Sequence, residues 1–316
     1  MIQPRNAMEA SLAIRAAWLH YVGRLTQAEV AKKLGVSGVK AHRLIARATQ
    51  EGAVKFVIDG DIAECVALES SLFERYSLDY CEVVPRVSDD MLPLRELGVA
   101  GAAFLQREME TGSNDLIGLG HGRTLSATVH QLPSITSKGV RFVSLLGGLT
   151  KNFSANPHDV MHHLAAKTGA EAYVMPVPFF ANRVEDREVL LNQRGVVEVM
   201  EMAARSSLKF VGIGTAEPSA QLVSSGMIER EEIQQVKALG AYGELLGHFF
   251  NENGESLETS LTARTLSVAL SDMQSSRIVA VAGGNEKVRA IEAILRSGLI
   301  SGLITDERTA SALMVD

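Results

Sequence analysis

The sequence has few cysteines and no long apolar segment. Its two cysteines, Cys65 and Cys81, are too few for a disulfide framework and lack the CxxC spacing of metal or redox sites, so we expect ordinary packing roles for both. No run of about 18 apolar residues occurs, and residues 1–20 lack a charged segment followed by an apolar core and a small-residue cleavage site. We therefore expect a cytoplasmic protein with no membrane partner.

The chain nevertheless has the composition of a large globular protein, with an uneven distribution of charge. With 316 residues, of which 46% are hydrophobic and 22% charged, it is long enough for two domains. The net charge is −6, but residues 1–58 contain nine Lys or Arg and three Glu, a balance of +6 that leaves −12 for the remainder. A basic domain on an acidic one indicates nucleic-acid binding at one end only. A solvated charged surface is the alternative.

Two short helices joined by a tight turn are indicated between residues 26 and 50. Thr26 and Glu29 have the S/T-x-x-E spacing of a capping box, in which each side chain binds a backbone amide at the start of a helix. Gly35 suits the left-handed residue that commonly ends such a helix, and Ser37 can cap the next one. The pattern predicts a helix-turn-helix. A helical hairpin serving as a dimerisation arm is the alternative.

The second of these helices is expected to have an apolar and a basic face. At helical spacing the inner positions are Ala41, Leu44, Ile45 and Ala48, and the outer positions are Lys40, Arg43 and Arg47. An apolar-periodic segment precedes the pair and the alternating segment "AVKFVID" follows it, which together predict a winged helix-turn-helix that binds double-stranded DNA. The predicted DNA-binding set, with Gln27 on the DNA backbone, is Gln27, Ser37, Lys40, His42, Arg43 and Arg47.

Beyond residue 60 short apolar runs alternate with helical stretches, which predicts an α/β fold with a largely parallel sheet. Four runs end in glycine turns: "GLGHGRT" (118–124), "LLGGLT" (145–150), "VGIGT" (211–215) and "VAGGNEK" (281–287). Open parallel sheets bind ligands at the carboxyl ends of their strands, so we expect the turns to surround one pocket suited to an anion. The first turn matches neither GxGxxG nor a Walker A sequence, but Arg123, Thr124 and Lys287 suit a small phosphate ester.

Histidines and one Glu/His pair suggest other chemistry. His158 and His162 lie one helical turn apart beside His163, but without an acidic partner or an HExxH sequence we expect a surface or helix-capping role and predict no metal or other cofactor. Glu244 and His248 in "AYGELLGHFF" also lie one turn apart. They could act as acid and base on a sugar or hydrogen-bond its hydroxyl groups.

The order and spacing of several segments resemble the SorC family of bacterial transcriptional regulators over nearly all of the chain. These segments are "TQAEVAKKLGVS", "GLGHGRTL", "FVGIGT", "GAYGELLGHFFNENG" and "VAGGNEKVRAIEAILRSGLISGLITDERTASALM". The resemblance implies a sugar-sensing homo-oligomer, dimeric or tetrameric, with a helix-turn-helix DNA-binding domain over residues 1–59. It also implies an effector-binding and oligomerisation domain over 60–316, Rossmann-like and similar to sugar-phosphate isomerases and deaminases.

The same resemblance implies where the effector binds. The turn 120–124, Glu244 and Lys287 match positions at which such regulators hold a phosphorylated sugar or related metabolite. With the other glycine turns, the predicted effector-binding set is Gly120, His121, Gly122, Arg123, Thr124, Gly148, Glu244, Asn285 and Lys287. Effector binding is expected to change the arrangement of two or four effector domains and so the spacing of the DNA-binding domains on operator DNA.

The predicted recognition helix departs from the family pattern. Where members commonly read Ser-Arg-x-x-Val-Ser-Arg-Leu, Gly38 replaces the first Arg and His42 the second Ser, so a different operator is expected. The variant "VKAHRLIA" resembles regulators of erythritol catabolism, whose effector would be a four-carbon polyol or its phosphate. A pentose, hexose or triose phosphate is the alternative effector. One competing function is a sugar-phosphate isomerase or deaminase with an added DNA-binding domain. A purely structural oligomerisation module is another, but it leaves the basic face and the glycine turns unexplained.

Overall fold

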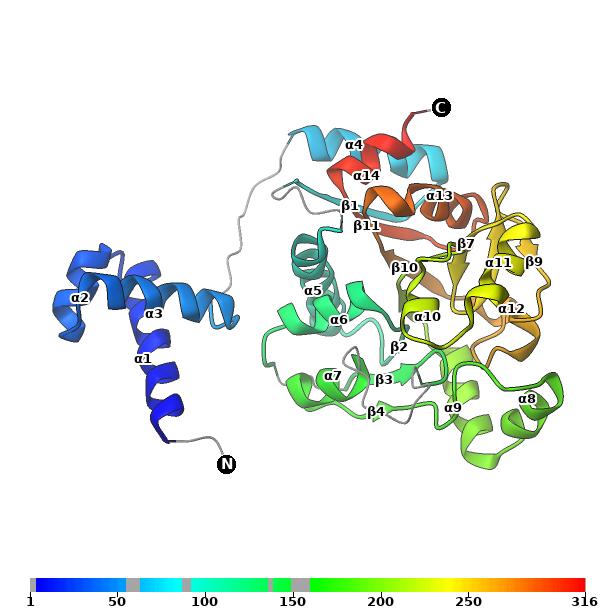
Figure 1. The fold of residues 1–316 in the computed structure, drawn as a ribbon, viewed down its shortest axis with the longest axis horizontal. Coiled ribbons are helices and arrows are strands. Elements are labelled where there is room, and N and C mark those ends of the chain that lie inside the picture. The colour runs from blue at the N-terminus through cyan, green and yellow to red at the C-terminus, as the bar shows by residue number, and fades with distance from the viewer. Residues whose placement is uncertain (1–3, 55–62, 87–91, 136–138, 149–159, 316) are drawn as a thin grey trace. The chain divides into compact units, whose positions relative to one another are not determined.

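The structure, a computed structural model, describes residues 4–54, 63–86, 92–135, 139–148 and 160–315. The chain divides into two compact units, Met1–Gly60 and Asp61–Asp316, which we call the head and the body. Figure 1 labels many of their helices and strands. Within the described ranges, none of the helices combines the length and the hydropathy that a bilayer crossing requires.

The described part of the head, residues 4–54, consists of three helices: α1 (Pro4–Tyr21), α2 (Gln27–Leu34) and α3 (Gly38–Gln50). Both predicted helix starts are confirmed. Thr26 and Glu29 form the capping box before α2, and the Ser37 hydroxyl accepts a hydrogen bond from the Lys40 amide at the start of α3. Gly35 ends α2 in the left-handed region, with φ of 65°.

The head has a small core in which α3 packs against α1. Ala13, Ala16 and Ala17 of α1 are buried, and their small side chains let the two helices approach closely. The predicted inner face of α3 is confirmed, because Ala41, Leu44, Ile45 and Ala48 are all buried. Most of the segment "AVKFVID", expected to form the wing, lies outside the described residues.

Removing the cap of α2 should destabilise the head. In Thr26→Ala the Glu29 amide loses its acceptor, so the free energy of unfolding should fall by about 1 kcal/mol. The single tryptophan, Trp18, lies in α1 and is 57% exposed, so its fluorescence during urea denaturation reports the head. Ser11→Ala on the exposed side of α1 is the control and should leave the transition in place. An unmoved transition in Thr26→Ala would show that the cap contributes no stability.

A seven-stranded parallel sheet runs through the body in the order β1-β11-β10-β5-β2-β3-β4. Its strands are β1 (Tyr80–Val84), β2 (Leu116–Leu119), β3 (Arg141–Ser144), β4 (Ala172–Tyr173), β5 (Leu208–Val211), β10 (Arg277–Val281) and β11 (Gly302–Asp306). From β2 the chain continues outward to β3 and β4, then returns to β5 on the other side of β2. The winding direction therefore reverses between β2 and β5, the place where open parallel sheets bind ligands. The predicted Rossmann-like architecture is confirmed.

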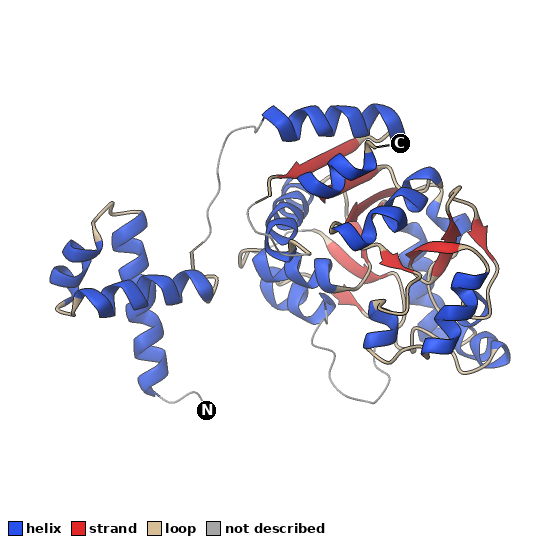
Figure 2. Ribbon diagram, turned by 45° about the horizontal axis from the view of Figure 1, so that its top comes forward, coloured by secondary structure: helices blue, strands red, loops and turns tan. Residues whose placement is uncertain are grey.

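Helices cover both faces of this sheet, as Figure 2 shows. Alternate residues of β10 enter different cores: Ile278 and Ala280 lie in one, and Val279 and Val281 in the other. The helices of the body are α4 (Ala63–Tyr76), α5 (Leu94–Thr111), α6 (Arg123–Gln131), α7 (Val160–Thr168), α8 (Val184–Leu191), α9 (Arg194–Arg205), α10 (Gln221–Ser224), α11 (Arg230–Ala238), α12 (Leu270–Met273), α13 (Val288–Arg296) and α14 (Glu307–Leu313), with the 3₁₀ turns η1 (Thr262–Arg264) and η2 (Asn285–Lys287). The thiols of α4 and β1 are free, one buried and one half-buried, in keeping with packing roles.

A second, antiparallel sheet has the order β6-β7-β8-β9. Its strands are β6 (Gly214–Thr215), β7 (Ala241–Leu245), β8 (His248–Asn251) and β9 (Ser256–Leu257). β6 follows β5 almost directly, and Gly214 pairs with Glu244 of β7. A Cβ atom at position 214 would stand 2.1 Å from the Glu244 carboxylate, so any side chain there would have to displace this carboxylate. The small sheet thus carries Glu244 to the carboxyl end of β5.

Candidate functional site

The face of α3 opposite the head core is open. Val39, Arg43 and Gln50 lie along it at helical spacing and are exposed. His42 is also exposed, and its Nδ1 atom lies 3.3 Å from Oε1 of Gln27 at the start of α2. The head therefore presents Gln27, His42 and Arg43 of the predicted DNA-binding set together on its surface.

Arg47 occupies a different environment from Arg43. Its guanidinium forms ion pairs with Glu51, at 2.7 Å, and with Glu9 of α1, at 3.4 Å, so its charge is largely neutralised within the head. Lys40 is half-buried, at the edge of the exposed face. The three cations predicted on one outer face therefore differ in exposure and in partners. Arg43 is exposed to solvent, whereas Arg47 forms an ion pair with α1.

A cavity of about 320 Å³ lies at the carboxyl ends of β2, β5 and β10. It lies where the winding of the sheet reverses, which is the place where open parallel sheets bind ligands. The turn after β2 contributes His121, Gly122, Arg123 and Thr124, the turn after β5 contributes 212–215, and η2 contributes Lys287. All four predicted glycine turns thus contribute to one cavity, the turn at 145–150 through Leu146.

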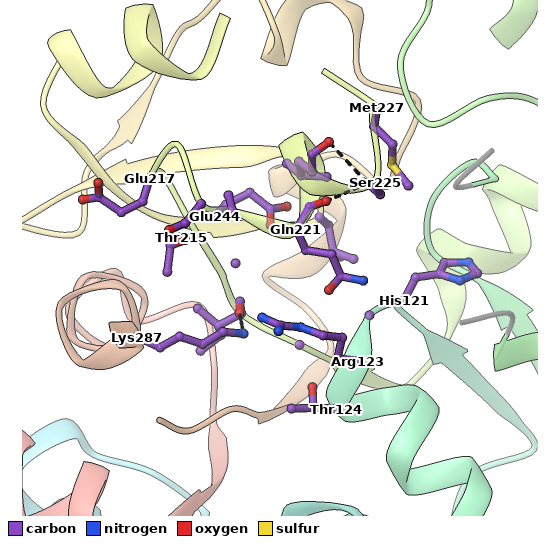
Figure 3. A pocket seen from close by; sticks show the side chains of 18 of the residues that line it. His121, Arg123, Thr124, Thr215, Glu217, Gln221, Ser225, Met227, Glu244 and Lys287 are labelled. Carbon is purple, nitrogen blue, oxygen red and sulfur yellow. Dashed lines mark hydrogen bonds between the residues drawn. The ribbon is translucent and has the colours of Figure 1, made fainter. Parts of the chain in front are cut away.

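Two cations, Arg123 and Lys287, line this cavity with three carboxylates, Glu217, Glu244 and Glu286, of which Glu217 forms an ion pair with Lys237 outside the lining. The side chains of Arg123 and Lys287 point toward each other in Figure 3. Lys287 Nζ donates to the Ile213 carbonyl oxygen at 2.5 Å, and the Gly247 amide donates to Glu244 at 2.6 Å. Burial, with Arg123 nearby, lowers the pKa of Lys287 to about 8, and burial raises the pKa of Glu244. The cavity therefore brings two cationic side chains together beside a hydrogen-bonding carboxylate.

The start of α6 adds to this anion-binding character. Gly122 precedes the helix with φ of 126°, a value that favours glycine, and the first free amides of α6 belong to the turn that lines the cavity. The partial positive charge of a helix N-terminus favours a bound anion. His121 Nε2 lies 3.2 Å from Ser144 Oγ, which itself donates to the Leu146 carbonyl, so the imidazole is tied to the end of β3.

Three residues of the predicted effector set are placed elsewhere. Among the described residues that line the cavity, Gly120, Gly148 and Asn285 do not occur. The Gly120 amide donates to the Phe210 carbonyl, and the Gly148 amide to the Val177 carbonyl, so both glycines join neighbouring segments of backbone.

The "VAGG" turn likewise has a structural role. The Gly284 amide donates to Asp306 Oδ2 at 3.0 Å and to Thr309 Oγ1 at 2.8 Å, so it is already bonded within the protein. A Cβ atom at Gly283 would stand 2.3 Å from the same Asp306 carboxylate. The Gly284 amide is therefore not free to bind an anion, and the turn leads into η2, which places Lys287 at the cavity.

One wall of the cavity contains none of the effector-binding residues predicted from the sequence. This wall is the segment from β6 through α10, and its lining residues include Thr215, Glu217, Ser219, Gln221, Ser225 and Met227. A Cβ atom at Gly122 would stand 3.8 Å from Gln221 Oε1, so Gln221, labelled in Figure 3, faces the turn that precedes α6. The sequence feature that could have indicated this wall is the segment "GTAEPSAQLVSSGM", in which small polar residues directly follow a strand and its glycine turn. Apolar side chains complete the lining, among them Phe179 and Leu246.

Among the described residues, the histidines considered for metal or acid–base chemistry do not line this cavity. His248 Nε2 lies 3.1 Å from the Val268 carbonyl oxygen, and His248 is not among the described residues that line the cavity. His158 lies outside the described residues. His162 and His163 are exposed on α7, and within the described ranges no group of three or more His, Cys, Asp or Glu side chains could hold a metal ion.

Comparison with known proteins relates both units to one family. Residues 60–315 match the family model "Putative sugar-binding domain". Over 304 residues the chain is 61% identical to the erythritol catabolism regulatory protein EryD of Brucella abortus, covering 96% of each protein. It is 31% identical over 310 residues to the transcriptional regulator LsrR of Klebsiella pneumoniae, covering 97% of this chain and 93% of the relative.

Solved structures agree with these relationships. The full-length sorbitol operon regulator SorC from Klebsiella pneumoniae superposes with a TM-score of 0.73 at 25% identity, covering 97% of this chain and 99% of that protein. A DeoR family transcriptional regulator from Listeria monocytogenes has the same fold over 79% of this chain, with a TM-score of 0.73 at 22% identity. The chain therefore belongs to the SorC family of sugar-binding bacterial transcriptional regulators, and it is a regulator rather than an enzyme.

Proposed function

We propose that the head binds operator DNA through α3 and that a phosphorylated four-carbon polyol in the body cavity controls this binding. DNA binding is assigned to residues 1–59, and effector binding and oligomerisation to 60–316. The observation that carries the proposal is the convergence of Arg123 and Lys287 at the N-terminus of α6. Two cations beside free helix amides form a good site for a phosphate group.

The remaining polar side chains suit the hydroxyl groups of a polyol. Glu244 accepts hydrogen bonds, and Gln221 and Ser225 can donate and accept them. A relative with 61% identity is named for erythritol catabolism, which favours erythritol phosphate over pentose, hexose and triose phosphates. The effector acts by shifting a conformational equilibrium. Its binding favours one arrangement of a homo-oligomer, and this arrangement sets the spacing of the heads on DNA.

The proposal is tested with the full chain and a labelled duplex selected by that chain from a random-sequence library. Erythritol 4-phosphate, unphosphorylated erythritol, and triose, pentose and hexose phosphates are titrated by calorimetry, and DNA binding is followed by fluorescence anisotropy. Erythritol phosphate should bind and change the affinity for DNA, whereas erythritol should bind much more weakly. Phosphorus NMR should recover the ligand unchanged. A response to erythritol alone contradicts the phosphate site, and a product contradicts the role of sensor.

Effector binding should weaken as the pH rises above 8. Lys287 in the free protein has a pKa of about 8, lowered by burial, so about nine-tenths of it is charged at pH 7 and about one-tenth at pH 9. A phosphate ester is already a dianion across this range. Calorimetry should show an affinity about tenfold lower at pH 9 than at pH 7. In Lys287→Met the difference should disappear, and equal affinities in the unmodified protein would show that Lys287 does not meet the phosphate.

A further inference from the structure

We infer that Val39 reads a thymine in the major groove of the operator, through apolar contact between its isopropyl group and the C5-methyl group of the base. The inference rests on the proposed DNA binding by α3. It names one base of the target and the side chain that selects it.

The exposure and the position of Val39 carry the inference. At 81% exposed, it is the most exposed large apolar side chain among the described residues. A single exposed valine elsewhere on a protein surface needs no explanation. This one is the second residue of α3, and the N-terminal residues of a recognition helix are those that contact base edges.

The surroundings of Val39 leave its isopropyl group free to approach a groove. Apart from its chain neighbours and the backbone of α3 itself, no atom lies within 4 Å of the place where a Cβ atom at Gly38 would stand, and Ser37 before it is small. Arg43 lies one turn further along the same exposed face. The start of α3 is therefore sterically open, with a cation beside it to draw the helix toward DNA.

The chemistry of the groove then selects the partner. Among the four bases only thymine presents a methyl group in the major groove, whereas the other edges and the phosphates present polar atoms. An isopropyl group against those polar atoms would deprive them of water without supplying a hydrogen bond. Thymine is the partner that gains from the contact.

A double-mutant cycle between protein and DNA tests this contact. In the duplex selected by the full chain, each thymine is replaced in turn by deoxyuridine, which pairs identically and lacks only the methyl group. At one position in each half-site the replacement should weaken binding by about fourfold, the effect of one buried methyl-sized group. In Val39→Ala the same replacement should have no effect. Val22→Ala, a change at an exposed valine after α1, should keep the full fourfold sensitivity.

The outcomes separate this inference from the proposed function. Failure to enrich any duplex would contradict DNA binding by the head, and the inference with it. A selected duplex that is insensitive to deoxyuridine, or equally sensitive with Val39→Ala, would overturn the inference alone. Circular dichroism of Val39→Ala checks the fold, which alanine in the first turn of a helix does not disturb.

Discussion

Replacing Arg43 by alanine should weaken binding to the selected duplex by about 1–3 kcal/mol, roughly 5- to 150-fold, if the guanidinium contacts a base edge. Arg43 is exposed on the face of α3 opposite the core, and among the described residues it has no ion-pair partner. Its charge and its fork of donors are therefore available to guanine or to phosphate. Anisotropy titration of the labelled duplex measures the loss.

Two further variants show what kind of contact Arg43 makes. Arg47→Ala removes the same group from the same helix, but from ion pairs with Glu9 and Glu51, so it should weaken binding less than Arg43→Ala. Arg43→Lys keeps the charge and loses the bidentate geometry, so a base contact should remain impaired and a phosphate contact should recover. Equal binding by Arg43→Ala and the unmodified chain would remove Arg43 from the interface.

Lys287→Met should shift the response to a phosphorylated effector to much higher effector concentrations while leaving operator affinity intact. Methionine has a similar length and no charge, so the phosphate loses a charge-assisted hydrogen bond worth about 1.5–3 kcal/mol, which corresponds to roughly 10- to 150-fold weaker binding. The Nζ atom is already held by the Ile213 carbonyl at 2.5 Å, beside Arg123. Calorimetry measures effector affinity, and anisotropy measures the DNA response.

Arg289→Met provides the matched control for this variant. Arg289 follows Lys287 by two residues, is exposed, and stacks over the Tyr242 ring, and it is not among the described residues that line the cavity. It should bind the effector as the unmodified chain does. A full response in Lys287→Met would mean that the phosphate binds elsewhere, and loss of DNA binding without effector would mean that the variant disturbs the whole protein.

Local chemistry made the head predictable from its sequence. A capping box, a glycine that favours positive φ and a serine cap act within a few residues of one another, so Thr26, Gly35 and Ser37 placed two helices correctly. The environment of Arg47 was not predictable in this way. Its partner Glu9 is 38 residues away in sequence, and only the packing of α3 on α1 brings the two together.

The position of the cavity could be predicted from the sequence, but only some of its lining residues could be. Strands ending in glycine turns placed Arg123 and Lys287 at one edge of a parallel sheet, because that topology gathers the ends of its strands. Contacts between distant segments, such as that of Gly284 with Asp306, decide which backbone amides of these turns remain free to face the cavity. The wall from β6 through α10 has no strong periodicity or motif, so only the tertiary structure reveals it.

The two faces of α3 share no residue, and this separation bears on how new regulators arise. Ala41, Leu44, Ile45 and Ala48 hold the helix in place, while Val39, His42 and Arg43 project away from it. Mutations on the outer face can accumulate without weakening the fold, so a duplicated gene could acquire a new target site before its sensor changes. The same separation makes the head a convenient starting point for engineered transcription switches, in which operator choice is varied on a fixed scaffold.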